Sequence, residues 1–213
     1  MSPSADIDPN TGQMEIELKL RLASKAAHTA VIELFRALPG SRFLGTDRQE
    51  NFFLDGPARD LLRRSVRLDA LTGAYSPKSV VTLKGKGGVR NGVSVNEELE
   101  EPIDDKLLDL IVHNPSVLPS VAGTHPLLAK VMEEHPQASQ LEVTGSFKNE
   151  RNIFEWSGLK LEIDETQYSF GSAYEIEVEH DDPQRAKDLL SNGIDFTNSQ
   201  RTKFANMKFG SVL

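Results

Sequence analysis

The run from Met14 to Leu22 alternates charged and apolar side chains, and it constrains the fold more than any other part of the sequence. Every odd position in residues 15 to 21 is charged and every even position in residues 16 to 22 is a large apolar residue. Side chains of a β-strand alternate between its two faces, so the run predicts a strand with one apolar and one charged face. A sheet whose outer face is solvated shows the same pattern. The alternation alone therefore leaves open which face is inside.

The same alternation returns several times along the chain. Charged residues alternate with apolar ones at residues 160 to 164, acidic residues do so at 174 to 179, lysines at 82 to 86, and Ser, Asn and Glu at 93 to 100. Like charges two residues apart lie about 7 Å from each other on a strand, and they disfavour a sheet unless an opposite charge lies nearby. A barrel that turns these faces inward would line one lumen with both signs of charge.

Such a lumen has a recognisable chemistry. Carboxylate oxygens bind hard cations such as Mg²⁺, and Lys and Arg bind phosphate oxygens. The sequence therefore favours a site for a small polyanion that is bound together with a divalent cation.

The composition narrows the class of protein. The chain has 213 residues, 38% hydrophobic and 26% charged, which is typical of a globular protein of one domain. A net charge of −8 argues against a general partner of nucleic acid or of anionic membranes, and no apolar run has transmembrane length. The absence of cysteine excludes disulfides and thiolate chemistry, and we expect a cytoplasmic location. We expect residues 1–13 to be a flexible leader and residues 14–213 to form one domain.

Helix signals are fewer than strand signals. Ser24 is expected to cap a helix from Lys25 to about Leu38, and Asn198 or Ser199 to cap a terminal helix that contains Lys203. Further helices are expected at residues 104–112, 124–134 and 183–191, the first two forming a helical insert at about 104–135. Further strands are expected at 51–54, 63–69, 82–86, 93–100, 141–148, 152–156, 159–164 and 173–179. The chain is thus predicted to be mainly β (α+β).

Other motifs are weaker. Residues 85 to 88 lack the spacing of a Walker phosphate loop, so we interpret them as a hairpin. The five histidines show no metal-ligand spacing, and no Gly-x-Ser-x-Gly elbow is present. Glu98 and Glu100 could be a glycosidase pair, but the basic strands would then have no role.

Motifs from residue 14 to residue 209 resemble one family. Residues Glu15 to Lys19 match its E-x-E-x-K pattern, and other charged motifs follow in family order. On these residues the chain resembles the CYTH superfamily, also called triphosphate tunnel metalloenzymes. Residues 91–94, 151–156 and 170–171 look most like its plant inorganic tripolyphosphatase branch. The later motifs are Arg67, Leu83 to Lys86, Glu98, Glu100, Arg151, Ile163 to Thr166, Tyr174 to Glu177 and Thr202 to Phe204.

The resemblance implies an eight-stranded antiparallel β-barrel that forms a tunnel with flanking helices. Acidic residues would hold Mg²⁺ or Mn²⁺, basic residues would hold a triphosphate, and Lys19, Glu15 and Glu17 would be catalytic. The implied metal ligands are Glu15, Glu17, Glu98, Glu100, Asp164, Glu175 and Glu177. The implied substrate ligands are Lys19, Arg67, Lys84, Lys86, Arg151 and Lys203. Relatives usually have Arg-x-Arg where this chain has Arg67, Leu68 and Asp69, so Asp69 is a departure that is expected on the tunnel face.

The predicted function is a metal-dependent triphosphatase that hydrolyses inorganic tripolyphosphate to pyrophosphate and phosphate. Alternatives are a thiamine triphosphatase, a class IV adenylyl cyclase-like enzyme, a non-catalytic triphosphate or polyphosphate-binding module, and an interaction barrel with solvated charges. The expected partner is the small-molecule substrate, with no nucleic acid and no membrane, and the chain is expected to be a monomer.

Overall fold

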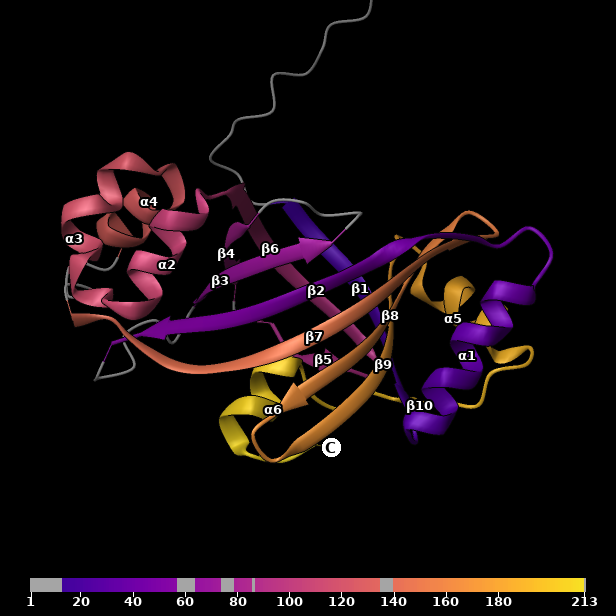
Figure 1. The fold of residues 1–213 in the computed structure, drawn as a ribbon. Helices are drawn as coiled ribbons and strands as arrows, with labels where there is room; N and C mark the ends of the chain where they lie inside the picture. Colours follow the sequence, from indigo (N-terminus) through magenta and orange to yellow (C-terminus); the bar gives the residue numbers. More distant parts are fainter. Residues whose placement is uncertain (1–12, 57–63, 74–78, 86, 135–139, 213) are drawn as a thin grey trace, which may run out of the picture.

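The computed structural model, which describes residues 13–56, 64–73, 79–85, 87–134 and 140–212, has a closed antiparallel β-barrel at its centre (Figure 1). Neighbouring strands follow the order β1-β9-β8-β7-β2-β3-β4-β6, and β6 pairs with β1 to close the ring. The mainly β barrel of eight strands that the sequence predicted is confirmed. Its strands are β1 (Gln13–Leu22), β2 (Arg42–Asp55), β3 (Arg64–Gly73), β4 (Val80–Gly85), β6 (Val93–Pro102), β7 (Glu142–Trp156), β8 (Leu159–Tyr168) and β9 (Gly171–Glu179). Two-residue strands, β5 (Val89–Arg90) and β10 (Thr197–Asn198), pair with β6 and β1.

The alternating sequence of β1 separates the two sides of the barrel wall. Leu18 and Leu20 are fully buried in an apolar cluster outside the barrel, where they pack with Phe35 of a covering helix. Glu17 and Lys19 point to the other side and line the lumen. The apolar face is therefore the outer one, covered by helices, and the charged face is the inner one.

Helices cover both ends of the barrel (Figure 1). At one end α1 (Lys25–Ala37) and α5 (Pro183–Ser191) pack on β1, β8 and β9 through the cluster around Leu18. At the other end, the helices between residues 105 and 134 bury Ile111 and Leu128 against Leu68 and Leu83 of the barrel. These helices are α2 (Asp105–His113), α3 (Leu118–Val121) and α4 (Pro126–Glu134), with 3₁₀ turns at Pro115–Val117 and Ala122–Thr124. No helix in the described ranges is long and apolar enough to span a membrane.

The last helix, α6 (Lys203–Phe209), lies against the barrel wall beside β7. Its Phe204 packs on Phe53, with ring centroids 4.8 Å apart. Thr202 caps it by accepting a hydrogen bond from the backbone N–H of Ala205. The expectation that Asn198 or Ser199 would cap this helix was wrong, because β10 contains Asn198 and the hydroxyl of Ser199 donates to Glu175. Ser24 caps α1 as expected, by accepting from Ala27.

The largest differences from the strands expected from the sequence are at β7 and β2. The segments expected at 141–148 and 152–156 form one strand, β7, and β2 begins at Arg42 rather than at residue 51. Residues 149–151, between the two expected segments, are polar or charged. In the structure Asn149 faces inward and accepts a hydrogen bond from Thr166, and Arg151 faces the lumen. A polar lumen therefore allows polar residues within an unbroken strand.

Candidate active site

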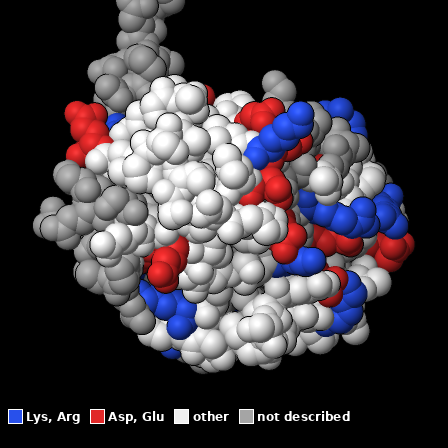
Figure 2. All heavy atoms as spheres, turned by 60° about the vertical axis from the view of Figure 1, so that its left-hand side comes forward, with Lys and Arg blue, Asp and Glu red and all other residues white. Residues whose placement is uncertain are grey.

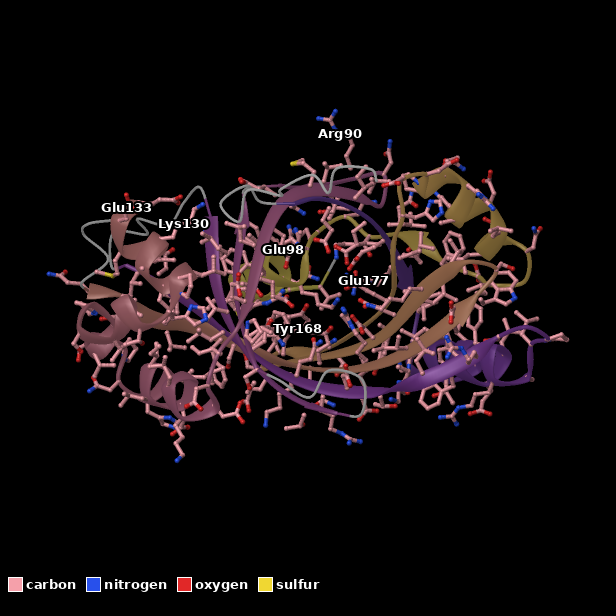
Figure 3. The ribbon with its side chains drawn as sticks, turned by 90° about the horizontal axis from the view of Figure 1, so that it is seen from above. Arg90, Glu98, Lys130, Glu133, Tyr168 and Glu177 are labelled. Atoms are coloured by element: carbon pink, nitrogen blue, oxygen red, sulfur yellow. The ribbon has the colours of Figure 1, made fainter. Side chains whose placement is uncertain are left out.

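A cavity of about 530 Å³ lies within the barrel, and all eight strands and α6 contribute to its lining. In the view from above, Glu98 and Glu177 lie inside the ring of strands, whereas Arg90 points away from it (Figure 3). Acidic and basic side chains also gather along one hollow of the surface, beside a broad face of uncharged residues (Figure 2). The acidic lining residues are Glu15, Glu17, Asp55, Asp69, Glu98, Glu100, Glu162, Glu177 and Glu179, and the basic ones are Lys19, Arg67, Lys84, Arg151, Lys160, Lys203 and Lys208.

Three cations converge on Glu177 of β9. Its Oε1 lies 2.8 Å from Nζ of Lys19 and 2.5 Å from Nζ of Lys203, and its Oε2 lies 2.8 Å from Nη2 of Arg151. Lys203 and Arg151 also share Asp164, each with an N···O distance of 2.8 Å or less. Burial alone would raise the pKa of Glu177, but these three cations hold it well below its usual range. Four elements, β1, β7, β9 and α6, thus meet at one ionised carboxylate.

A second group of charges lies on β1, β3, β4 and β6. Nζ of Lys84 is 2.9 Å from Oε2 of Glu15 and 2.5 Å from Oε2 of Glu98. Arg67 donates from Nε to Oδ2 of Asp69 at 2.7 Å. Against the effect of burial, a hydrogen bond with Glu15 and the charges of Arg67 and Lys84 lower the pKa of Glu98 to about 2. The two groups share β1, so they lie on one continuous wall.

The carboxyl groups of β1 are crowded by other carboxylates. Burial, with a contribution from Glu177, raises the pKa of Glu17 to about 7. Burial and the neighbouring Glu98 raise the pKa of Glu15 to about 9. Glu17 also stands directly opposite Glu179 in the β1–β9 register. Negative charge at this wall is therefore in excess, and a bound cation would relieve it.

The donor set at this wall fits a divalent metal ion. Carboxylate oxygens are supplied by three neighbouring strands, β6, β1 and β9, and hard cations such as Mg²⁺ and Mn²⁺ prefer oxygen ligands. Within the described ranges no group of three acidic or histidine side chains is already arranged to hold a metal ion. The carboxylates form ion pairs with lysines instead. Glu15, Glu17 and Glu177 are the residues that would hold the ion once these partners turn to a substrate.

The structure brings most of the sequence-predicted residues together. Asp164 and Glu175 are exceptions, because both are fully buried and lie behind the lining rather than in it. Asp164 holds Arg151 and Lys203, while Glu175 accepts from Ser199 at 2.6 Å. Lys86 falls outside the described residues. The predicted residues that line the cavity are Glu15, Glu17, Lys19, Arg67, Lys84, Glu98, Glu100, Arg151, Glu177 and Lys203.

Among the lining residues that were not selected from the sequence, Lys160, Glu162 and Glu179 lie on β8 and β9. Glu162 pairs with Arg151 and lies 2.8 Å from Nζ of Lys160. All three continue the alternation of β8 and β9, so the period of two already placed them on the charged face. Asp69 was expected on the tunnel face and does line the cavity.

Comparisons with known proteins agree with this architecture. The family model of the CYTH domain matches residues 13–202. HpAC1 from Hippeastrum, described as a candidate adenylyl cyclase with a dominant triphosphatase activity, is 35% identical, with a TM-score of 0.84 over 93% of this chain and 97% of that protein. A candidate adenylate cyclase from Bacillus halodurans shares the fold at 18% identity and a TM-score of 0.62, covering 91% of this chain and 97% of that one. No curated protein matches the chain.

Proposed function

This chain belongs to the CYTH domain family, and from this premise we propose that it is a divalent-metal-dependent triphosphatase that hydrolyses inorganic tripolyphosphate to pyrophosphate and phosphate. The observation that carries the proposal is the cavity itself, in which strands of a closed barrel present cations and carboxylates to one enclosed space. The triphosphatase activity of HpAC1, a relative at 35% identity, supports the reaction class.

The basic residues would bind the phosphoryl oxygens. Lys19, Arg151 and Lys203 already point at one place because Glu177 contacts all three. A triphosphate that enters would take over these donors, and charge-assisted hydrogen bonds to phosphate are stronger than neutral ones. Because the carboxylates fix the three side chains beforehand, binding requires little ordering of the site.

Glu15, Glu17 and Glu177 would hold the metal ion. A bound divalent cation would neutralise the triphosphate and lower the pKa of the attacking water. Lys19 lies between Glu17 and Glu177, with Nζ 2.6 Å and 2.8 Å from their oxygens, so it can contact both a phosphoryl oxygen and that water. A neighbouring carboxylate would accept the proton of the water as it attacks the terminal phosphorus.

A substrate and metal panel tests the proposal. Phosphate release would be measured from tripolyphosphate, ATP, thiamine triphosphate and pyrophosphate, each with Mg²⁺, Mn²⁺, Ca²⁺ or EDTA. We expect tripolyphosphate with Mg²⁺ or Mn²⁺ to give the highest rate and EDTA to abolish it. Equal rates on ATP, release of cyclic AMP, or activity in EDTA would contradict the proposal.

Other expectations about the chain stay predictions. They are its monomeric state, its cytoplasmic location, its small-molecule partner, and its division into a leader and one domain. Analytical ultracentrifugation at several protein concentrations would test the monomeric state.

A further inference from the structure

We propose that Asp69 determines the anion specificity of the tunnel by holding Arg67 away from the substrate. The inference rests on the proposed function, because it concerns which cations of this cavity reach a phosphate. In this proposal Arg67, which the sequence predicted as a phosphate ligand, does not contact the substrate directly.

The contacts of Arg67 are already made within the protein. Its Nε donates to Oδ2 of Asp69 at 2.7 Å, and its Nη2 lies 3.3 Å from the hydroxyl of Thr82. Oε1 of Glu98 is a further 3.9 Å partner of Nη2. A guanidinium binds phosphate through two parallel N–H groups. A phosphate bound through Nε and Nη2 would have to displace Asp69 from Nε.

Asp69 pairs with a cation of its own strand, as Glu17 does with Lys19. It lies on the same strand as Arg67, two residues further on, so their pairing does not depend on other strands. Asp164 supports Arg151 from behind the lining, whereas Asp69 lines the cavity itself. Its Oδ1 is buried and has no hydrogen-bond partner among the described residues. A substrate at Arg67 would therefore lie beside a carboxylate oxygen that accepts no hydrogen bond.

Apart from Arg67, the surroundings of Asp69 do not offset its charge. Its cross-strand neighbours are Asn51 on β2 and Val80 on β4, both uncharged and both in the lining. Burial and the nearby Glu100 and Glu98 disfavour the ionised form of Asp69, whereas Arg67 favours it. Carboxylates thus outnumber cations at this part of the wall, and screening by water is weak in a confined space.

With Arg67 held by Asp69, the tunnel should prefer anions that need few contacts with Lys and Arg side chains. The metal ligands proposed above lie on β1 and β9, so their engagement leaves the Arg67–Asp69 pair on β3 intact. An anion with more phosphoryl groups than tripolyphosphate requires an additional contact, and in this chain Asp69 repels it. Removing the charge of Asp69 should therefore favour tetrapolyphosphate more than tripolyphosphate.

Binding measurements on two variants test this. Asp69→Asn keeps the size of the side chain and removes its charge, and the double variant Arg67→Gln with Asp69→Asn also removes the freed cation. Dissociation constants for tripolyphosphate and tetrapolyphosphate would be measured by calorimetry with Ca²⁺, while phosphate release in the same samples shows whether the ligand stays intact. Asp69→Ser serves as a second charge-removing variant, and thermal unfolding checks that each protein is folded.

We expect Asp69→Asn to bind tripolyphosphate on the order of tenfold more tightly, and tetrapolyphosphate by a larger factor. The double variant should return to wild-type affinity for both anions. Unchanged affinity in Asp69→Asn, or a gain that survives Arg67→Gln, would overturn the inference. Wild-type protein that binds tripolyphosphate but never hydrolyses it with Mg²⁺ would instead contradict only the proposed function. Absence of binding in every variant would overturn both.

Discussion

Nζ of Lys203 lies 2.5 Å from Oε1 of Glu177, so the last helix of the fold is joined by an ion pair to the middle of the barrel. Only 12% of the Lys203 side chain and 3% of the Glu177 side chain are exposed. A substrate that binds here therefore contacts a residue whose position depends on α6 as well as on the strands.

Replacing Lys203 tests this dependence. Lys203→Gln should weaken tripolyphosphate binding on the order of tenfold or more, because it removes one charged contact from a poorly solvated site. Lys148→Gln is the matched control, because this lysine is exposed on the outer side of β7 and pairs with Glu50. The measurement is the Michaelis constant for tripolyphosphate at saturating Mg²⁺. Equal effects of the two substitutions would place Lys203 outside the binding site.

Replacing Glu17 should separate activity from stability. Glu17→Gln removes an oxygen charge that metal ligation needs, so turnover should be abolished. The pKa of Glu17 is raised to about 7, so ionising this group costs the folded state stability as the pH rises from about 4 to about 7. The variant lacks this cost, and its unfolding temperature at pH 8 should not fall below that of wild type. An inactive variant with a clearly lower unfolding temperature would indicate a structural role instead.

Glu175 and Glu177 should behave differently although both belong to one sequence motif. Glu175 lies behind the lining, with Ser199 and Arg21 as partners. Glu175→Gln should therefore lower the free energy of unfolding by about 1–3 kcal/mol and leave considerable turnover. Glu177→Gln should abolish turnover. Urea denaturation and phosphate release on both variants give the comparison, and loss of all activity in Glu175→Gln without loss of stability would make Glu175 a ligand.

His28 should make stability depend on pH. This residue of α1 is buried with its ring against Tyr174, and burial together with the charge of Lys25 lowers its pKa below 6.5. The unfolded chain takes up a proton near pH 6.5 that the folded protein does not, so stability is lost as the pH falls below that value.

The loss from this one group has an upper limit of about 1.4 kcal/mol per pH unit. His28→Phe keeps a ring against Tyr174, and it should lose less stability than wild type between pH 7 and pH 5. Replacing the exposed His113 of α2 by Gln is the control. The free energy of unfolding would be measured by urea denaturation at each pH. If it changed with pH equally in wild type and His28→Phe, the prediction would be contradicted, because the ring would then be protonated in the folded protein as well.

The alternation of charge grouped most of the lining residues on one face, because a period of two assigns each residue to a face, and the resemblance to the CYTH superfamily implied the eight-stranded barrel. The alternation could not predict depth within the lumen, and so it did not separate Glu175 from Glu177. Depth is set by α6 and by Ser199, which reach these carboxylates from more than 20 residues away in the chain. The prediction of two strands in place of β7 was wrong for a related reason. Polar residues such as Asn149 indicate a loop only when the interior is apolar.

The closure of the barrel by β1 has a consequence for how the protein is made. Glu17 pairs with Ser94 on one side and with Glu179 on the other, so the first strand of the ring needs the last one to complete its pairing. During synthesis β1 can bind β6 early, but its other edge stays open until residue 179 has left the ribosome. Pairings so distant in sequence form slowly, and open strand edges can join other chains. We therefore expect chains truncated before β9 to aggregate, and newly made chains to depend on chaperones until the ring closes.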